Sequence, residues 1–130
     1  MKVLSTVARI LLGIIFVFFG SNMVGLALGH PILHSPMPPG PEGQFLTGLF
    51  VTRFVLLVGL CQVIGGLLML IGQYVTLGLI ILGPVIVCID FLHLSVAPSG
   101  LPMAALVTIL WILVALAHKH HLAGIFARTA

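Results

Sequence analysis

Long apolar stretches separated by short polar connections dominate the chain. Four such stretches lie at residues 3–28, 45–71, 75–96 and 103–117. None shows the alternation of apolar and polar residues that a membrane-spanning strand needs, so each stretch predicts a helix. About 20 apolar residues in a helix cross the hydrocarbon core of a bilayer. The pattern therefore predicts an all-α protein, a polytopic membrane four-helix bundle.

The composition supports this class of protein. Hydrophobic residues make up 61% of the 130 residues and charged residues only 5%, whereas roughly 25% of the residues of a soluble domain are charged. Four spans and their connections account for the whole length, so we expect a single membrane domain over residues 1–130. We expect this domain to lie in the lipid bilayer. No phosphate-binding motif or basic patch indicates binding of a nucleic acid.

Basic residues at the two ends of the chain set the expected orientation. Lys2 and Arg9 lie at the start of the first stretch, Lys119 follows the fourth, and the connections 29–44 and 97–102 contain no Lys or Arg. Because cytoplasmic connections carry an excess of Lys and Arg, both termini are expected to be cytoplasmic and these two connections to face outward.

The longer outer connection, residues 29–44, is rich in proline. Proline removes backbone donors and biases its neighbours toward extended conformations, so no helix is expected here. We expect a stiff segment across the outer end of the bundle. A lid that closes a pocket and a rigid strap are both compatible with it.

Glycine spacing predicts where helices approach each other. Gly59 and Gly66 lie seven residues apart on one face of the second stretch. Small residues at such spacing let two helix backbones come close. The second stretch is therefore expected to pack tightly against a neighbouring helix.

Polar residues near the outer end form the candidate site. Arg53 and Asp90 lie inside apolar stretches, where an unpaired charge costs about 2.5 to 3.5 kcal/mol. Their expected depths, about 12 Å and about 9 Å below the outer end, match closely enough to predict an ion pair. His93 shares the face of Asp90 one turn away. With Asn22 and with Glu42 in the outer connection, these residues are the candidate ligand-binding set.

This set supports three interpretations. It is an ion pair that fixes the register of the helices, a ligand-binding pocket, or a path for protons or ions. No motif identifies a catalytic residue. Pro31 separates His30 from His34, so a shared helical face is not expected, although an outer metal site assembled from several elements stays an alternative. No metal is assigned.

Three stretches carry a resemblance to a known family. They are GLCQVIGGLL at residues 59–68, GPVIVCI at 83–89 followed by His93, and APSGLP at 97–102; the start from Arg9 to Gly20 is similar too. The chain resembles the DoxX family of small four-helix bacterial membrane proteins over nearly its full length. The resemblance implies a multi-pass protein of the bacterial inner membrane, linked to thiosulfate:quinone oxidoreductase and to redox-associated membrane complexes.

The residues match the family pattern unevenly. His93 matches it, whereas family members often carry Asn at the position of Cys88 and an apolar residue at the position of Asp90. The resemblance therefore supports the fold and His93, and the pair of Arg53 and Asp90 is particular to this chain.

Together these observations predict a membrane protein with an outward-facing polar pocket. We expect an accessory or small-ligand-binding subunit of a redox system, with a quinone as the candidate cofactor. His93 would hydrogen-bond the ligand, Asp90 would set the charge of the imidazole, and Arg53 would balance Asp90 or contact an anionic group. A small-solute or proton transporter and a purely structural subunit remain alternatives, as do a homo-oligomer and a redox membrane complex as assemblies.

A labelling experiment tests the expected orientation. In a variant without the native cysteines, a cysteine in place of Ser35 should react with a membrane-impermeant thiol reagent added to intact cells. A cysteine in place of Thr129 should react only after lysis, because the chain end is expected to be cytoplasmic. The mass shift of the labelled protein measures both, and the reverse pattern would contradict the orientation.

Overall fold

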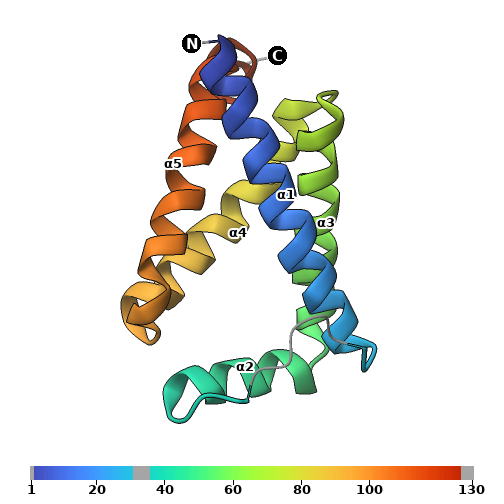
Figure 1. Ribbon diagram of the computed structural model, residues 1–130, viewed down its shortest axis with the longest axis vertical. Helices are drawn as coiled ribbons and strands as arrows, with labels where there is room; N and C mark the ends of the chain where they lie inside the picture. Colours follow the sequence, from blue (N-terminus) through green and yellow to red (C-terminus); the bar gives the residue numbers. More distant parts are fainter. Residues whose placement is uncertain (1, 31–35, 127–130) are drawn as a thin grey trace.

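The computed structural model describes residues 2–30 and 36–126, and within them it is helical, without a strand (Figure 1). The elements are α1 Lys2–Ala27, α2 Pro41–Val51, α3 Phe54–Ile71, α4 Val75–Ser95, η1 Pro98–Gly100, α5 Leu101–Ala117, α6 Lys119–Ala123 and η2 Gly124–Phe126. Four segments are long and apolar enough to cross a membrane, namely α1, α3, α4 and the run Pro98–Ala117 that contains α5. The predictions of an all-α protein and of four candidate spans are confirmed.

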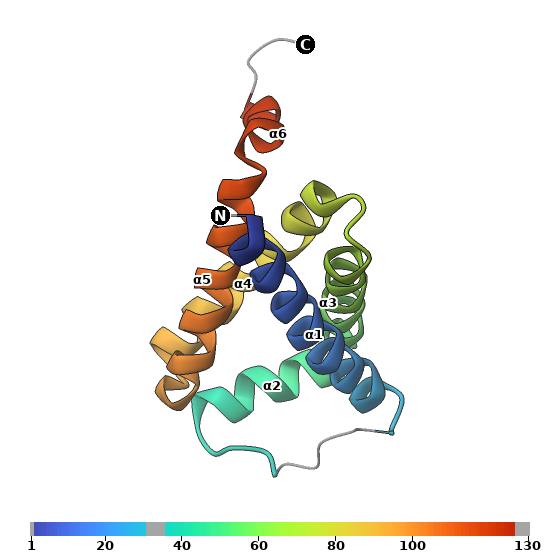
Figure 2. The same ribbon diagram turned by 45° about the horizontal axis from the view of Figure 1, so that its top comes forward.

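The long helices form an open bundle. Helix α1 runs antiparallel to α3, and α4 crosses diagonally from the end of α3 to the side of α5 (Figures 1 and 2). The start of α1 and the end of α5 lie at one end of the molecule, and α2 lies across the other end. The best-buried side chains fill the half of the bundle that contains the start of α1. They are Leu12, Met69, Leu79, Leu82 and Val114.

Glycines bring the backbones of α1 and α3 into contact. A Cβ atom on Gly66 would lie 2.9 Å from the carbonyl oxygen of Gly13, and one on Gly59 would lie 3.0 Å from the carbonyl oxygen of Gly20. Both distances are shorter than ordinary carbon–oxygen contacts, so any side chain at these positions would separate the helices. The expected tight packing at Gly59 and Gly66 takes place here, against α1. We call these four glycines the glycine seam.

Arg9 fastens the same two helices near the chain start. Its Nη1 donates a hydrogen bond to the carbonyl of Met69, and lies 3.5 Å from the carbonyl of Leu70. These carbonyls belong to the last turn of α3, which ends at Gly72 in the left-handed conformation, φ 81°. A cation is favourable at a helix C-terminus, where carbonyls lack intrahelical partners. The positive charge of Arg9 is thus balanced by backbone carbonyl groups of α3.

Helices α4 and α5 are in contact near a proline of α4. Pro84 lies inside α4 and has no N–H to offer the carbonyl of Ile80, one turn back. Trp111 of α5 donates its indole N–H to the carbonyl of Leu79 at 3.1 Å, and its ring lies 3.5 Å from the place a Cβ on Gly83 would take. This contact holds α5 against the middle of α4.

The second apolar stretch is two helices, so the prediction of one helix over 45–71 is wrong. Helix α2 begins at Pro41, inside the connection 29–44 that was expected to lack a helix, and ends at Val51. Proline fits the first turn of a helix because the N–H that it lacks would have no partner there. Residues 31–35 of this connection, with His34 and Ser35, lie outside the described residues, as do residues 127–130 with Thr129.

Arg53 makes the break between α2 and α3. It adopts φ 61°, the left-handed conformation that residues with a side chain rarely take, and its N–H bonds the carbonyl of Phe50 at 3.1 Å. Before it, the Thr52 hydroxyl donates to the carbonyl of Gly48 at 2.7 Å. The chain changes direction here, and α2, whose first residues belong to the outer connection, lies across one end of the bundle (Figure 1).

The glycine seam predicts opposite effects for the same substitution at two helical glycines. Gly66→Ala should lower the free energy of unfolding by about 1 to 3 kcal/mol, because its methyl group meets the backbone of α1. Gly48→Ala in α2, where nothing lies within 4 Å, should raise it by up to about 1 kcal/mol, because alanine favours the helix. Unfolding in mixed micelles with increasing SDS measures both. Equal effects of the two substitutions would contradict the seam.

Candidate functional site

A cavity of about 220 Å³ lies between the four long helices, lined by residues of α1, α3, α4 and α5. It begins where the core ends, since Phe16 and Val107 belong to both. Its walls are mainly apolar, and Phe19, Met23 and Met103 are among them. Three polar side chains interrupt this surface, those of Asn22, Gln62 and His93. We call it the central cavity.

Gln62 is the most unusual residue of the central cavity. Its side chain is 4% exposed, and its Oε1 is buried without a hydrogen-bond partner among the described residues. Gln62 lies on α3 between Gly59 and Gly66 of the glycine seam. A Cβ atom placed on Gly20 would lie 2.8 Å from the Cβ atom of Gln62. An unpaired buried carbonyl costs about 1 to 3 kcal/mol. The tight helix contact therefore holds at the cavity wall a residue whose buried acceptor is unsatisfied.

His93 lines the same cavity from α4. Its Nδ1 lies 3.0 Å from the carbonyl oxygen of Ala97. Because a carbonyl only accepts, Nδ1 carries the proton, and in the neutral imidazole Nε2 is then an acceptor. The ring rests on Gly100, where any Cβ would overlap it. Glycine and the buried turn at Ala97 thus fix the orientation of the imidazole.

Asp90 does not take part in the central cavity. Its carboxylate accepts from the hydroxyl of Thr108 on α5, with distances of 2.9 and 2.7 Å to its two oxygens. Both residues line a shallow groove between α4 and α5 on the outside of the bundle. At about 100° per residue, the three-residue step from Asp90 to His93 leaves about 60° between them. That is enough for one to face the groove and the other the cavity.

Arg53 and Glu42 also lie apart from the central cavity. Arg53 is exposed and precedes α3 as its N-cap, and in the described part of the chain no ion pair joins it to Asp90. The predicted depth of Arg53 was counted from Phe45, whereas the span begins at Phe54. Glu42 is half-buried in the first turn of α2, where a negative charge is favourable.

The structure therefore brings together two of the five predicted residues, Asn22 and His93, and adds Gln62. Sequence reasoning missed Gln62 as a site residue, although the same signal that singled out Asn22, a polar amide within a long apolar stretch, applies to it. The sequence could not show which of its polar residues line the same cavity.

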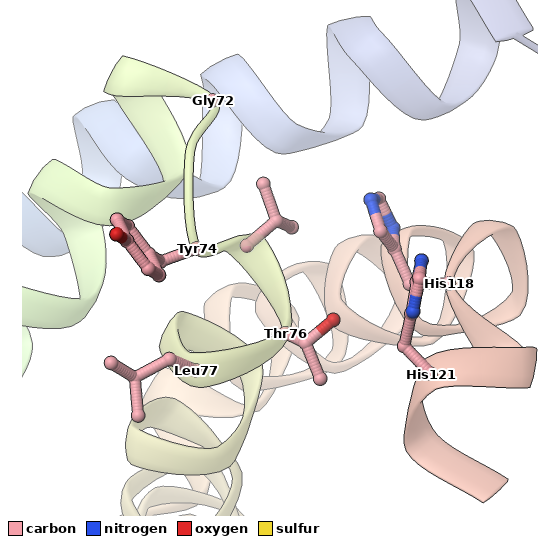
Figure 3. Close-up of a pocket in the computed structure, with 7 residues that line it drawn as sticks. Gly72, Tyr74, Thr76, Leu77, His118 and His121 are labelled. Carbon is pink, nitrogen blue, oxygen red and sulfur yellow. The ribbon is translucent and has the colours of Figure 1, made fainter. Parts of the chain in front are cut away.

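A second groove lies at the opposite end of the molecule, where α4 begins (Figure 3). Its volume is about 370 Å³, and Tyr74, Thr76, His118 and His121 are among the residues that line it. Nδ1 of His118 donates to the carbonyl of Val114 at 3.0 Å, so this ring is bound to its own helix. The groove is open, and residues 2–30 and 36–126 contain no cluster of His, Cys, Asp or Glu that could hold a metal ion.

Comparison with known proteins finds no family model, no curated protein and no solved structure that matches the chain. The site is therefore interpreted from its own geometry.

Because Arg53 is exposed, we predict that its side chain forms no buried ion pair. Arg53→Gly should leave the free energy of unfolding unchanged or raise it by about 1 kcal/mol, because glycine relieves the left-handed backbone. Tyr74→Gly, at φ 57° and also exposed, is the matched control, and unfolding in SDS micelles measures both. A loss of about 3 kcal/mol or more for Arg53→Gly alone would instead indicate a broken buried ion pair.

Proposed function

We propose that the protein is an integral membrane protein that binds a small ligand in the central cavity, as an accessory or ligand-binding subunit of a redox system. The observation that carries this proposal is that Gln62 lines the cavity while its buried Oε1 has no hydrogen-bond partner among the described residues. Buried polar groups in proteins are nearly always hydrogen-bonded. A ligand that fills the cavity would supply the missing partner.

A purely structural role fits Gln62 less well. A glutamine that only joins helices would bond a neighbouring helix, as Arg9 and Trp111 do in this bundle. Gln62 instead leaves an acceptor unpaired, at a cost to the folded protein without a ligand. Binding sites can retain such a cost because the ligand removes it.

The size of the cavity limits the ligand. A cavity of roughly 150 Å³ holds one benzene molecule, so the 220 Å³ here accommodate one ring with small substituents. Phe16 and Phe19 offer aromatic faces or edges to such a ring. A quinone-like head group with its apolar tail toward the bilayer has this shape. The resemblance to the DoxX family supports the same ligand class, together with a bacterial inner membrane and cytoplasmic termini.

A small-solute or proton transporter is the second candidate, and Asp90 favours it. An ionisable residue within a candidate span is costly and often marks a transport path. The carboxylate of Asp90 is half-buried, next to Thr108, in a groove of about 310 Å³. In that function, Asp90→Asn would abolish transport in proteoliposomes while leaving the central cavity unchanged.

Ligand-induced stabilisation tests the binding function. Wild-type protein in nanodiscs should melt higher with a short-chain hydroquinone, whose hydroxyl groups can donate to Gln62, because a ligand at 100 times its Kd adds about 2.7 kcal/mol of stability. Gln62→Met should lose most of this gain without melting lower in the absence of ligand, since methionine has a similar shape and removes the unpaired acceptor. Differential scanning fluorimetry measures both.

The control for this experiment is Gln73→Met, the same substitution in the exposed turn after α3. It should keep the full ligand effect. His93→Ala is less informative because it also removes the bond to Ala97. Wild-type protein that gains nothing from the hydroquinone, or Gln62→Met that gains as much as wild type, would contradict the proposal.

A further inference from the structure

Asp90 is an acidic residue in a candidate span, and the described residues do not balance its carboxylate. Within them, hydrogen bonds to the two carboxylate oxygens come from Thr108 alone. The same hydroxyl lies 2.8 Å from the carbonyl oxygen of Ala104. Because a hydroxyl carries one hydrogen, these three oxygens share a single donor. A carboxylate has about four acceptor positions, so most of those on Asp90 stay open.

The groove between α4 and α5 provides an apolar space beside this carboxylate. Asp90 and Thr108 line it, and its other walls are leucine, isoleucine and alanine side chains. Its volume of about 310 Å³ is about twice the roughly 150 Å³ that hold one benzene molecule. Asp90 lies five residues before Ser95, the last residue of α4, which is about 7.5 Å along the helix. A ligand can therefore reach it from that end of the bundle.

We infer that the groove between α4 and α5 binds a compact organic ammonium ion, a primary ammonium group on an apolar body of about one ring. The ammonium group supplies a positive charge and three N–H donors, which the open acceptor positions of Asp90 lack. The apolar body would lie against Leu94, Ala105 and Ile109. This site is separate from the central cavity, so the inference goes beyond the proposed function and does not depend on it.

A metal ion or a partner helix fits the groove less well. Calcium takes about six to eight oxygen ligands, whereas the polar side chains of the groove are only Asp90 and Thr108. Residues 2–30 and 36–126 also contain no group of His, Cys, Asp or Glu that could hold a metal ion. A helix with its side chains is about 10 to 12 Å wide, too large for a hollow of this volume. A small cation with an apolar body matches both the charge and the walls.

Two probes of similar shape test this inference. The para-fluorobenzylammonium ion and para-fluorobenzyl alcohol share the ring and the methylene group and differ in the head group. Fluorine NMR of each probe, titrated with wild-type protein in phosphatidylcholine nanodiscs at neutral pH and corrected with empty nanodiscs, gives both dissociation constants. We expect the ammonium ion to bind at least about tenfold more tightly, because hydrogen bonds to charged groups are stronger than those between neutral groups.

Three variants identify the groove as the place of binding. Asp90→Asn removes the charge but keeps the shape and an oxygen that can accept from Thr108, and it should abolish the preference for the ammonium ion. Glu42→Gln is the matched control, since it makes the same change of charge at the only other acidic residue of the chain, and it should keep the preference. Ala105→Leu leaves Asp90 in place and should abolish binding of both probes, because its larger side chain takes the space of the ring.

Each outcome decides for or against the ammonium site. Equal affinity of the wild type for the two probes, or no binding of either, would overturn it. So would a preference that Asp90→Asn retains, or one that Glu42→Gln loses as well. If Asp90→Asn fails to fold, the comparison within the wild type and the effect of Ala105→Leu decide. Failure of this site leaves the proposed function intact, because the hydroquinone and Gln62→Met test the central cavity separately.

Discussion

The contact between α1 and α3 across the glycine seam is the constraint on which the rest of the molecule depends. Two helix backbones that meet at Gly13 with Gly66 and at Gly20 with Gly59 leave no room for side chains between them. Such a contact is stabilised by close packing of the two backbones over a long interface. It aligns Arg9 with the last carbonyls of α3 and places Gln62 beside the cavity.

Satisfaction of polar groups explains how the remaining helices are held. Arg9 bonds backbone carbonyls of α3, Trp111 bonds the carbonyl of Leu79 in α4, and Asp90 accepts from Thr108. Each of these three contacts joins two helices, whereas Thr52 and His118 bond carbonyls one turn back in their own helix. Against this background the unpaired oxygen of Gln62 stands out, on a residue that lines the central cavity.

The site could be predicted only in part, and the reason is geometric. Asn22 and His93 were predicted, and both line the central cavity. Arg53 was placed too deep because an apolar stretch does not show where a helix changes direction; Thr52 and Arg53 are not strong helix breakers. Asp90 was expected to pair with Arg53, yet its partner is Thr108, which no spacing along the chain could reveal.

The sequence by itself determined the class of the protein, since the length and apolarity of its stretches and the near absence of charge dictate four candidate spans and an all-α fold. It also determined the close approach at Gly59 and Gly66. Only the tertiary structure decided that the second stretch splits into α2 and α3, and which polar residues share an interior. Those features depend on which face each helix turns toward its neighbours, and periodicity is a weak guide where nearly every residue is apolar.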